Sequence, residues 1–169
     1  MTFRTAALIG LAALSASWCA AARADDCAPV RAATLAGISR PYAATIKMPG
    51  PDGLPLTSHV VMTGDKMYLQ IRRTWTTKLI TSKELVDKAN KSALKELISC
   101  QRAGAEEIGG DTATIYAVDS QMPGHIGHSR VWISNASGLP LKTEVTLPGG
   151  ESMTSLFDYK NVAPPPGEK

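Results

Sequence analysis

Apolar and polar side chains alternate along much of the chain, which is the pattern of strands with one buried face. The alternation is clearest at 42–48, where Tyr42, Ala44, Ile46 and Met48 occupy every second position. Further extended segments are expected at 74–80, 98–103, 112–119 and 129–134, with turns or loops at 49–55 and 120–128. The pattern predicts seven or more antiparallel strands.

Two strand–turn–strand units share a sequence pattern. Segments 53–71 and 138–156 both begin with Gly-Leu-Pro-Leu, carry a valine at the same offset and continue into a glycine-containing turn. Glycine adopts the positive φ that tight hairpin turns require. The two segments therefore predict two equivalent antiparallel hairpins.

Two segments have the features of helices. Residues 27–36 can form a short helix that Gly37 is expected to end. Residues 82–98 follow the capping-box spacing of Thr81 and Glu84. The apolar side chains of this second helix share one arc, which comprises Leu85, Val86, Ala89, Ala93 and Leu97. Two helices beside an antiparallel sheet indicate an α+β fold with the helices on one side.

Residues 1–24 have the pattern of a secretory signal peptide. A positive charge precedes a short apolar run at 6–14, and an Ala-Arg-Ala cleavage site ends at Ala24. We therefore expect cleavage after Ala24 and export to a bacterial periplasm. The mature chain is expected to form a single domain at 25–162, followed by a disordered tail at 163–169.

The cysteines agree with this compartment. Cys19 is expected to be removed with the signal, because Trp18 fits poorly before a lipid-bearing cysteine. Cys27 and Cys100 then remain, and two cysteines in an exported protein indicate a disulfide. The alternative, a redox-active or metal-binding pair, has no CxxC motif or nearby Cys/His cluster to support it.

Basic residues are concentrated in one segment. Positions 66–95 contain six more lysines and arginines than acidic residues, whereas the rest of the mature chain is acidic. The candidate basic patch comprises Arg72, Arg73, Lys88, Lys91 and Lys95. These side chains are either solvated faces of a strand and a helix, or a landing surface for an acidic envelope protein or an anionic membrane. Nucleic acid is not an expected partner, since the chain is exported.

No pattern of residues indicates catalysis or metal binding. The sequence contains neither a GxSxG nucleophile motif nor a CxxC motif. His125 and His128 stand three positions apart, a spacing that on a strand directs the two rings to opposite faces. We therefore expect a non-enzymatic protein without a metal or cofactor.

Apolar residues on a strand and on the second helix form a candidate wall. Met67, Leu69, Ile71 and Trp75 occupy alternate positions and are expected to share one face. With the helix, the candidate wall comprises Met67, Leu69, Ile71, Trp75, Leu85, Val86 and Ala89. These side chains either pack into an ordinary core or line a cavity between the sheet and the helix.

Three stretches have the form of motifs found together in one family. Residues 129–147 contain a strand, a Gly-Leu-Pro turn and a strand, and residues 151–164 contain a strand followed by Tyr-x-x-Val-x-Pro. Residues 97–118 contain a hairpin with a central Gly-Gly pair. Together they resemble the bacterial lipoprotein-carrier superfamily, which includes LolA, LolB and outer-membrane lipoprotein-sorting proteins.

This resemblance implies a strongly curved, unclosed β-barrel covered by helices, with no catalysis and no cofactor. It also implies an apolar cavity for lipid acyl chains and an arginine that locks the lid, for which Arg40, Arg72 and Arg73 are candidates. One functional hypothesis is therefore a periplasmic carrier or sensor of an acyl-chain-like ligand, such as a lipid or lipoprotein. The alternative is an envelope interaction module with a packed core that binds a partner protein through its basic face.

Overall fold

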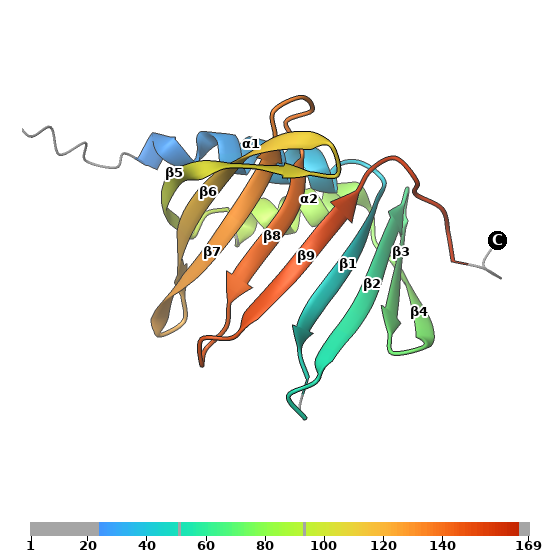
Figure 1. The fold of residues 1–169 in the computed structure, drawn as a ribbon. Coiled ribbons are helices and arrows are strands. Elements are labelled where there is room, and N and C mark those ends of the chain that lie inside the picture. The colour runs from blue at the N-terminus through green and yellow to red at the C-terminus, as the bar shows by residue number, and fades with distance from the viewer. Residues whose placement is uncertain (1–23, 51, 93, 166–169) are drawn as a thin grey trace, which may run out of the picture.

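The computed structural model describes residues 24–50, 52–92 and 94–165. Within this part of the chain, nine antiparallel strands form one curved, unclosed sheet in the order β4-β3-β2-β1-β9-β8-β7-β6-β5 (Figure 1). The strands are β1 (Tyr42–Pro49), β2 (Pro55–Thr63), β3 (Lys66–Ile71), β4 (Thr74–Leu79), β5 (Leu97–Ile108), β6 (Asp111–Met122), β7 (His125–Ser134), β8 (Pro140–Thr146) and β9 (Ser152–Asp158).

The helices lie on one side of the sheet, behind it in Figure 1. They are a 3-10 turn η1 (Ala24–Cys27), α1 (Ala28–Ile38) and α2 (Ser82–Lys91). The expected α+β fold, an unclosed antiparallel sheet with an N-terminal helix and an inserted helix on one side, is therefore confirmed. Neither α-helix in the described ranges has the length and hydrophobicity of a membrane span.

The two hairpins expected from the repeated pattern are both present. β2 pairs with β3 and β8 pairs with β9, each in antiparallel register. Thr63 pairs with Lys66 across a two-residue turn, where Gly64 has a φ of 57°. A tight two-residue turn requires this positive φ, which glycine adopts readily. The glycine in the sequence was therefore enough to predict the turn.

The connection between β6 and β7 is much shorter than the loop expected at 120–128. Met122 pairs directly with His125, which leaves a two-residue turn of Pro123 and Gly124. Proline sets the first φ of such a turn and Gly124 takes a φ of 81°. Both strands therefore extend further than their sequence pattern indicated.

Helix α1 runs past the glycine that was expected to end it. Gly37 lies inside the helix, and a Cβ at this position would come within 2.8 Å of the Tyr159 hydroxyl. The residue therefore allows the segment after β9 to approach the helix closely, and it does not act as a stop signal.

Helix α2 begins as expected but is shorter than the predicted span of 82–98. The Thr81 hydroxyl accepts a hydrogen bond from the Glu84 amide, and the Glu84 carboxylate accepts one from the Thr81 amide, which completes the capping box. The helix ends at Lys91, and β5 begins at Leu97. Ala93, placed on the apolar arc by its sequence position, lies outside the described residues.

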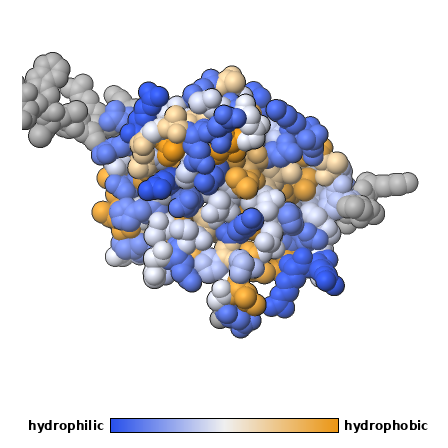
Figure 2. Space-filling model, viewed as in Figure 1, coloured by the Kyte–Doolittle hydropathy of each residue, from blue (hydrophilic) through white to orange (hydrophobic). Residues whose placement is uncertain are grey.

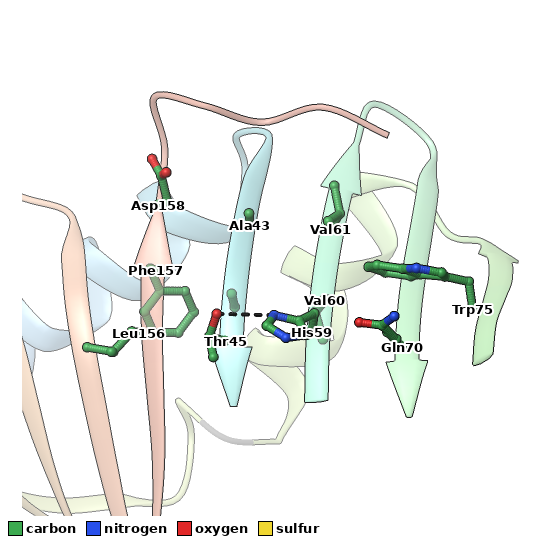
Figure 3. Close-up of a pocket in the computed structure, with 11 residues that line it drawn as sticks. Ala43, Thr45, His59, Val60, Val61, Gln70, Trp75, Leu156, Phe157 and Asp158 are labelled. Atoms are coloured by element: carbon green, nitrogen blue, oxygen red, sulfur yellow. Dashed lines mark hydrogen bonds between the residues drawn. The ribbon is translucent and has the colours of Figure 1, made fainter. Parts of the chain in front are cut away.

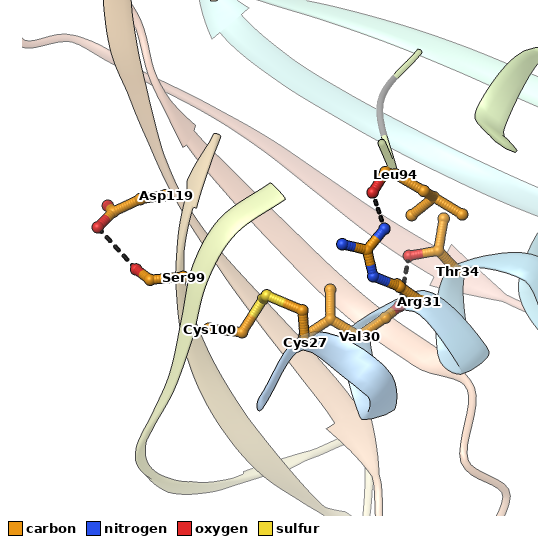
Figure 4. The surroundings of a disulfide bond; sticks show 8 residues. All are labelled: Cys27, Val30, Arg31, Thr34, Leu94, Ser99, Cys100 and Asp119. Carbon is orange, nitrogen blue, oxygen red and sulfur yellow. Dashed lines mark hydrogen bonds between the residues drawn. A yellow bond between two sulfur atoms is a disulfide. The ribbon is translucent and has the colours of Figure 1, made fainter. Parts of the chain in front are cut away.

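The main core joins α1 to the sheet. Cys27, Val30 and Ala33 of the N-terminal segment pack against four strand residues of the sheet, which are Cys100, Val118, Val131 and Ile133. We call the side of the sheet that carries these four strand residues the helix face, and the opposite side the outer face. The expected disulfide joins Cys27 to Cys100 within this core, with a Cα–Cα distance of 4.9 Å (Figure 4).

The expected signal peptide at 1–24 lies, apart from Ala24, outside the described residues, as do positions 166–169 of the expected tail. Residues 163–165 follow β9 without regular secondary structure. The division of the chain into signal, domain and tail stays a prediction.

Candidate functional site

Three residues of the candidate wall share the helix face of β3. Val131 packs on α1 and lies in the same row of directly paired residues as Ile71 of β3. The row crosses β8, β9, β1 and β2 at Thr143, Ser155, Ile46 and Ser58. Directly paired residues lie on the same side of a sheet. Met67, Leu69 and Ile71 therefore lie on the helix face, as their spacing predicted.

Trp75 lies on the other side of the sheet, so its assignment to the candidate wall was wrong. It pairs with Gln70, the neighbour of Ile71 on β3, and therefore points to the outer face. The two-residue turn at 72–73 reverses the chain, because Ile71 pairs with Thr74. The rule that every second residue lies on the same face holds only within one strand. Counting in twos from Ile71 through the turn to Trp75 therefore assigned Trp75 to the wrong face.

The helix face is incompletely covered in the half of the sheet that contains β1, β2 and β3. Met62 is fully buried, but Val60, Met67 and Leu69 are only half-buried, and Ile71 is 50% exposed. These aliphatic side chains form an apolar surface that the described residues leave partly open to solvent. A packed core would cover them more completely.

Helix α2 also keeps its apolar stripe partly exposed. Leu85, Val86 and Ala89 are half-buried, and no residue of α2 is buried. The charged side of the helix lies beside the end of β4, where Glu84 and Lys88 line a shallow pocket together with residues 78–80. The apolar stripe faces away from that pocket, because helical residues so spaced occupy different sides of the helix.

Arg31 of α1 anchors the segment that follows α2. Its guanidinium donates a hydrogen bond to the carbonyl oxygen of Leu94, a buried residue (Figure 4). The sequence resemblance implied an arginine that holds the lid, and Arg40, Arg72 and Arg73 were the candidates. That assignment stays a prediction, and the contact of Arg31 with Leu94 is one that sequence spacing gave no reason to expect.

A second apolar surface lies at the end of β9, where sequence analysis placed no site. Leu139, Leu141, Phe157 and Tyr159 help to line a pocket of about 630 Å³ beside the β5–β6 turn. The rings of Phe157 and Tyr159 are stacked with centroids 6.4 Å apart. Burial raises the pKa of the Tyr159 hydroxyl far above its usual value. The only sequence signal was two aromatic residues at the end of the closing strand.

The candidate basic patch is divided between two ends of the β3–β4 hairpin. Arg72 and Arg73 form its turn, whereas Lys88, Lys91 and Lys95 belong to α2 and the segment after it, which follow the far end of β4. Five residue steps along β3 separate the two ends, or about 16 Å. All five side chains are exposed, but they do not form one continuous surface.

Charge reversal can distinguish the two ends of this divided surface. We expect glutamate at Lys88, Lys91 and Lys95 to weaken binding to anionic vesicles about tenfold or more, since each lysine near a membrane contributes roughly 1 kcal/mol. Glutamate at Arg72 and Arg73 is the control and should have a smaller effect. Vesicle co-sedimentation at increasing salt measures both. Unchanged binding in the lysine variant would show that its lysines are only solvated.

His125 and His128 do not form a nucleophile–base pair with their neighbours. His128 Nδ1 lies 2.8 Å from an Asp119 oxygen, and the Ser99 hydroxyl donates to the other oxygen of the same carboxylate. These two hydrogen bonds, that of His128 first, lower the pKa of Asp119. The serine therefore donates to the carboxylate and not to the imidazole, which is unlike an activated nucleophile. His125 points to the opposite face of β7, as its spacing predicted.

The comparisons with known proteins identify the fold. No protein-family model and no curated protein matches the sequence. The structure is similar to that of the Mycobacterium tuberculosis lipoprotein LppX, with a TM-score of 0.52 and 16% identity over 82% of this chain and 97% of LppX. At this identity the likeness concerns the fold alone.

Two further structures match less closely. LprF from Mycobacterium bovis has a TM-score of 0.49 and 11% identity, over 85% of this chain and 97% of LprF. A domain of an outer membrane lipoprotein-sorting protein from Vibrio parahaemolyticus has a TM-score of 0.38 and 10% identity, over 87% of this chain and 95% of the domain. The curved, unclosed sheet with helices on one side, which the sequence resemblance implied, is the fold that this chain shares with LppX.

Proposed function

We propose that this protein is a non-enzymatic periplasmic carrier that holds an acyl-chain-like ligand between the helix face of the sheet and α2. The observation that carries the proposal is incomplete burial on two apolar surfaces. Leu85, Val86 and Ala89 of α2 and Leu69 of β3 are only half-buried. An amphipathic helix in a finished core would bury its apolar stripe.

The energetics favour a ligand of this class. Removing apolar surface from water contributes about 25 cal/mol per Å², or roughly 0.8 kcal/mol for each methylene of a chain. An acyl chain on these surfaces would complete the burial that the protein lacks. A fold of the LppX type supports the proposal only at the level of architecture. The pattern of an export signal at 1–24 supports the periplasm as the compartment.

Filling the space beside α2 tests the proposal. We expect Ala89→Trp to reduce the affinity for a fluorescent fatty-acyl probe about tenfold or more, because the indole would occupy the position of the chain. Lys91→Trp is the matched control, since Lys91 is an exposed residue on the charged side of the same helix. Fluorescence titration of both variants measures the effect.

Two results would reject the carrier. One is a parent protein, purified without its signal, that binds no acyl probe. The other is probe binding that Ala89→Trp and Lys91→Trp weaken equally, since that would place the probe away from the apolar stripe. Native mass spectrometry of protein from the host periplasm would add the identity of a bound lipid.

A further inference from the structure

The outer face carries a pocket that is separate from the proposed acyl site. Its volume is about 490 Å³, within the range of small-molecule sites. Five strands contribute to it, namely β4, β3, β2, β1 and β9 (Figure 3). The outer-face side chains at the pocket are Ala43, Thr45, His59, Val61, Gln70, Trp75, Leu156 and Asp158. The pairing register places all of these side chains on the face of the sheet that is opposite to the face of Leu69 and Ile71.

Trp75 forms one wall of this pocket. In Figure 3 its ring is seen nearly edge-on, between Val61 and Gln70, so that the ring stands up from the sheet. Ala43 is small and leaves a depression between Trp75 and Leu156. Hydrophobic and hydrophilic residues are mixed over the rest of this side of the molecule (Figure 2). The pocket therefore presents the flat face of the Trp75 indole beside the small side chain of Ala43.

A row of polar groups, which are Thr45, His59 and Gln70, lies next to the indole. Thr45 Oγ1 and His59 Nδ1 are 3.2 Å apart and hydrogen-bonded, which leaves His59 Nε2 for another partner. Gln70 lies between His59 and Trp75 on the sheet, and its side-chain amide has both donors and an acceptor. The row can therefore donate and accept hydrogen bonds at neighbouring points.

The charges around the pocket limit the class of ligand. No lysine or arginine is among its lining residues, so the pocket lacks the permanent cation that a phosphate or carboxylate site usually has. Asp158 lies at the far edge, and one of its oxygens accepts hydrogen bonds from the amides of Lys160 and Asn161. These two bonds lower the pKa of the Asp158 carboxyl. An acyl chain would leave the polar row without partners.

We propose that the outer-face pocket binds a neutral sugar, as part of a glycan of the cell envelope. The C–H groups of a sugar ring carry slight positive charge and pack against the negative face of an indole. Its hydroxyl groups both donate and accept, which matches Gln70, His59 and Thr45. The pocket spans four strand spacings, or about 19 Å between the outermost backbones, so more than one sugar ring fits along it.

Titration with neutral disaccharides tests this site. The probes are maltose, lactose and N,N′-diacetylchitobiose, with binding followed by NMR of the folded mature protein. We expect at least one probe to shift the signals of Trp75, Gln70 and His59. Trp75→Ala should weaken that binding about tenfold or more, and Gln70→Ala several-fold. Leu79→Ala is the control, because Leu79 is an exposed residue on the same face of β4 outside the pocket.

Each outcome decides the proposal. Binding that survives in Trp75→Ala, or the absence of binding by all three disaccharides, would overturn it. The sugar site does not depend on the carrier proposal, because the two lie on opposite faces. Trp75→Ala should leave acyl-probe affinity unchanged, and Ala89→Trp should leave disaccharide affinity unchanged.

Discussion

Removal of the Cys27–Cys100 disulfide should lower the free energy of unfolding by about 2–5 kcal/mol. The bridge joins residues 73 positions apart, so it excludes many extended conformations from the unfolded chain. Both cysteines are buried, at 1% and 2% exposure. The double variant Cys27→Ala with Cys100→Ala avoids a lone thiol and a buried hydroxyl. Urea unfolding of this variant and of the parent measures the difference.

A chemical control separates the bridge from side-chain packing. The parent protein in reducing buffer should unfold at a urea concentration near that of the double variant. Thiol titration of the unreduced, denatured mature protein should detect no free thiol, because both cysteines are bridged. Two free thiols in that titration, or equal stability with and without reductant, would contradict the prediction.

Local turn chemistry explains why much of the sheet could be predicted from sequence. The Gly64 turn and the repeated Gly-Leu-Pro-Leu segments marked both hairpins correctly. Signals of this kind depend on a few adjacent residues and need no knowledge of distant packing. The capping box at Thr81 and Glu84 located the start of α2 for the same reason.

Errors arose where distant contacts determine the structure. Gly37 was expected to end α1, but the approach of Tyr159 gives this glycine another role. Helix α2 ends at Lys91, although the apolar pattern continues to Leu97. Between these two positions, Leu94 is buried and its carbonyl oxygen accepts a hydrogen bond from Arg31. Sequence periodicity does not reveal contacts of this kind.

The candidate site was only partly accessible from sequence. Alternation identified the shared face of Met67, Leu69 and Ile71, because all three belong to one strand. It misplaced Trp75 across a turn, and it could not assemble the outer-face pocket, to which five strands contribute. Incomplete burial of an apolar stripe is likewise a tertiary property, which the periodicity of one segment does not reveal.

Two leucines, one in α2 and one in the segment that follows it, provide a direct test of whether this stripe is core or ligand surface. Leu94→Ala should cost about 2–5 kcal/mol of unfolding free energy, because this side chain is 5% exposed and its loss leaves a cavity. Leu85→Ala removes the same atoms from a half-buried position on α2. It should cost less than half as much while weakening acyl-probe binding.

Both substitutions remove the same side-chain atoms, so the difference reports burial, apart from the few tenths of a kcal/mol by which alanine favours the helical position of Leu85. Urea unfolding with unchanged m-values would show that both variants keep the parent's compactness. If Leu85→Ala destabilises the protein as much as Leu94→Ala does, α2 packs as part of a filled core. In that case its apolar stripe contributes to folding, and the carrier proposal loses the observation on which it rests. If only Leu94→Ala is costly and Leu85→Ala reduces probe affinity, the stripe serves the ligand.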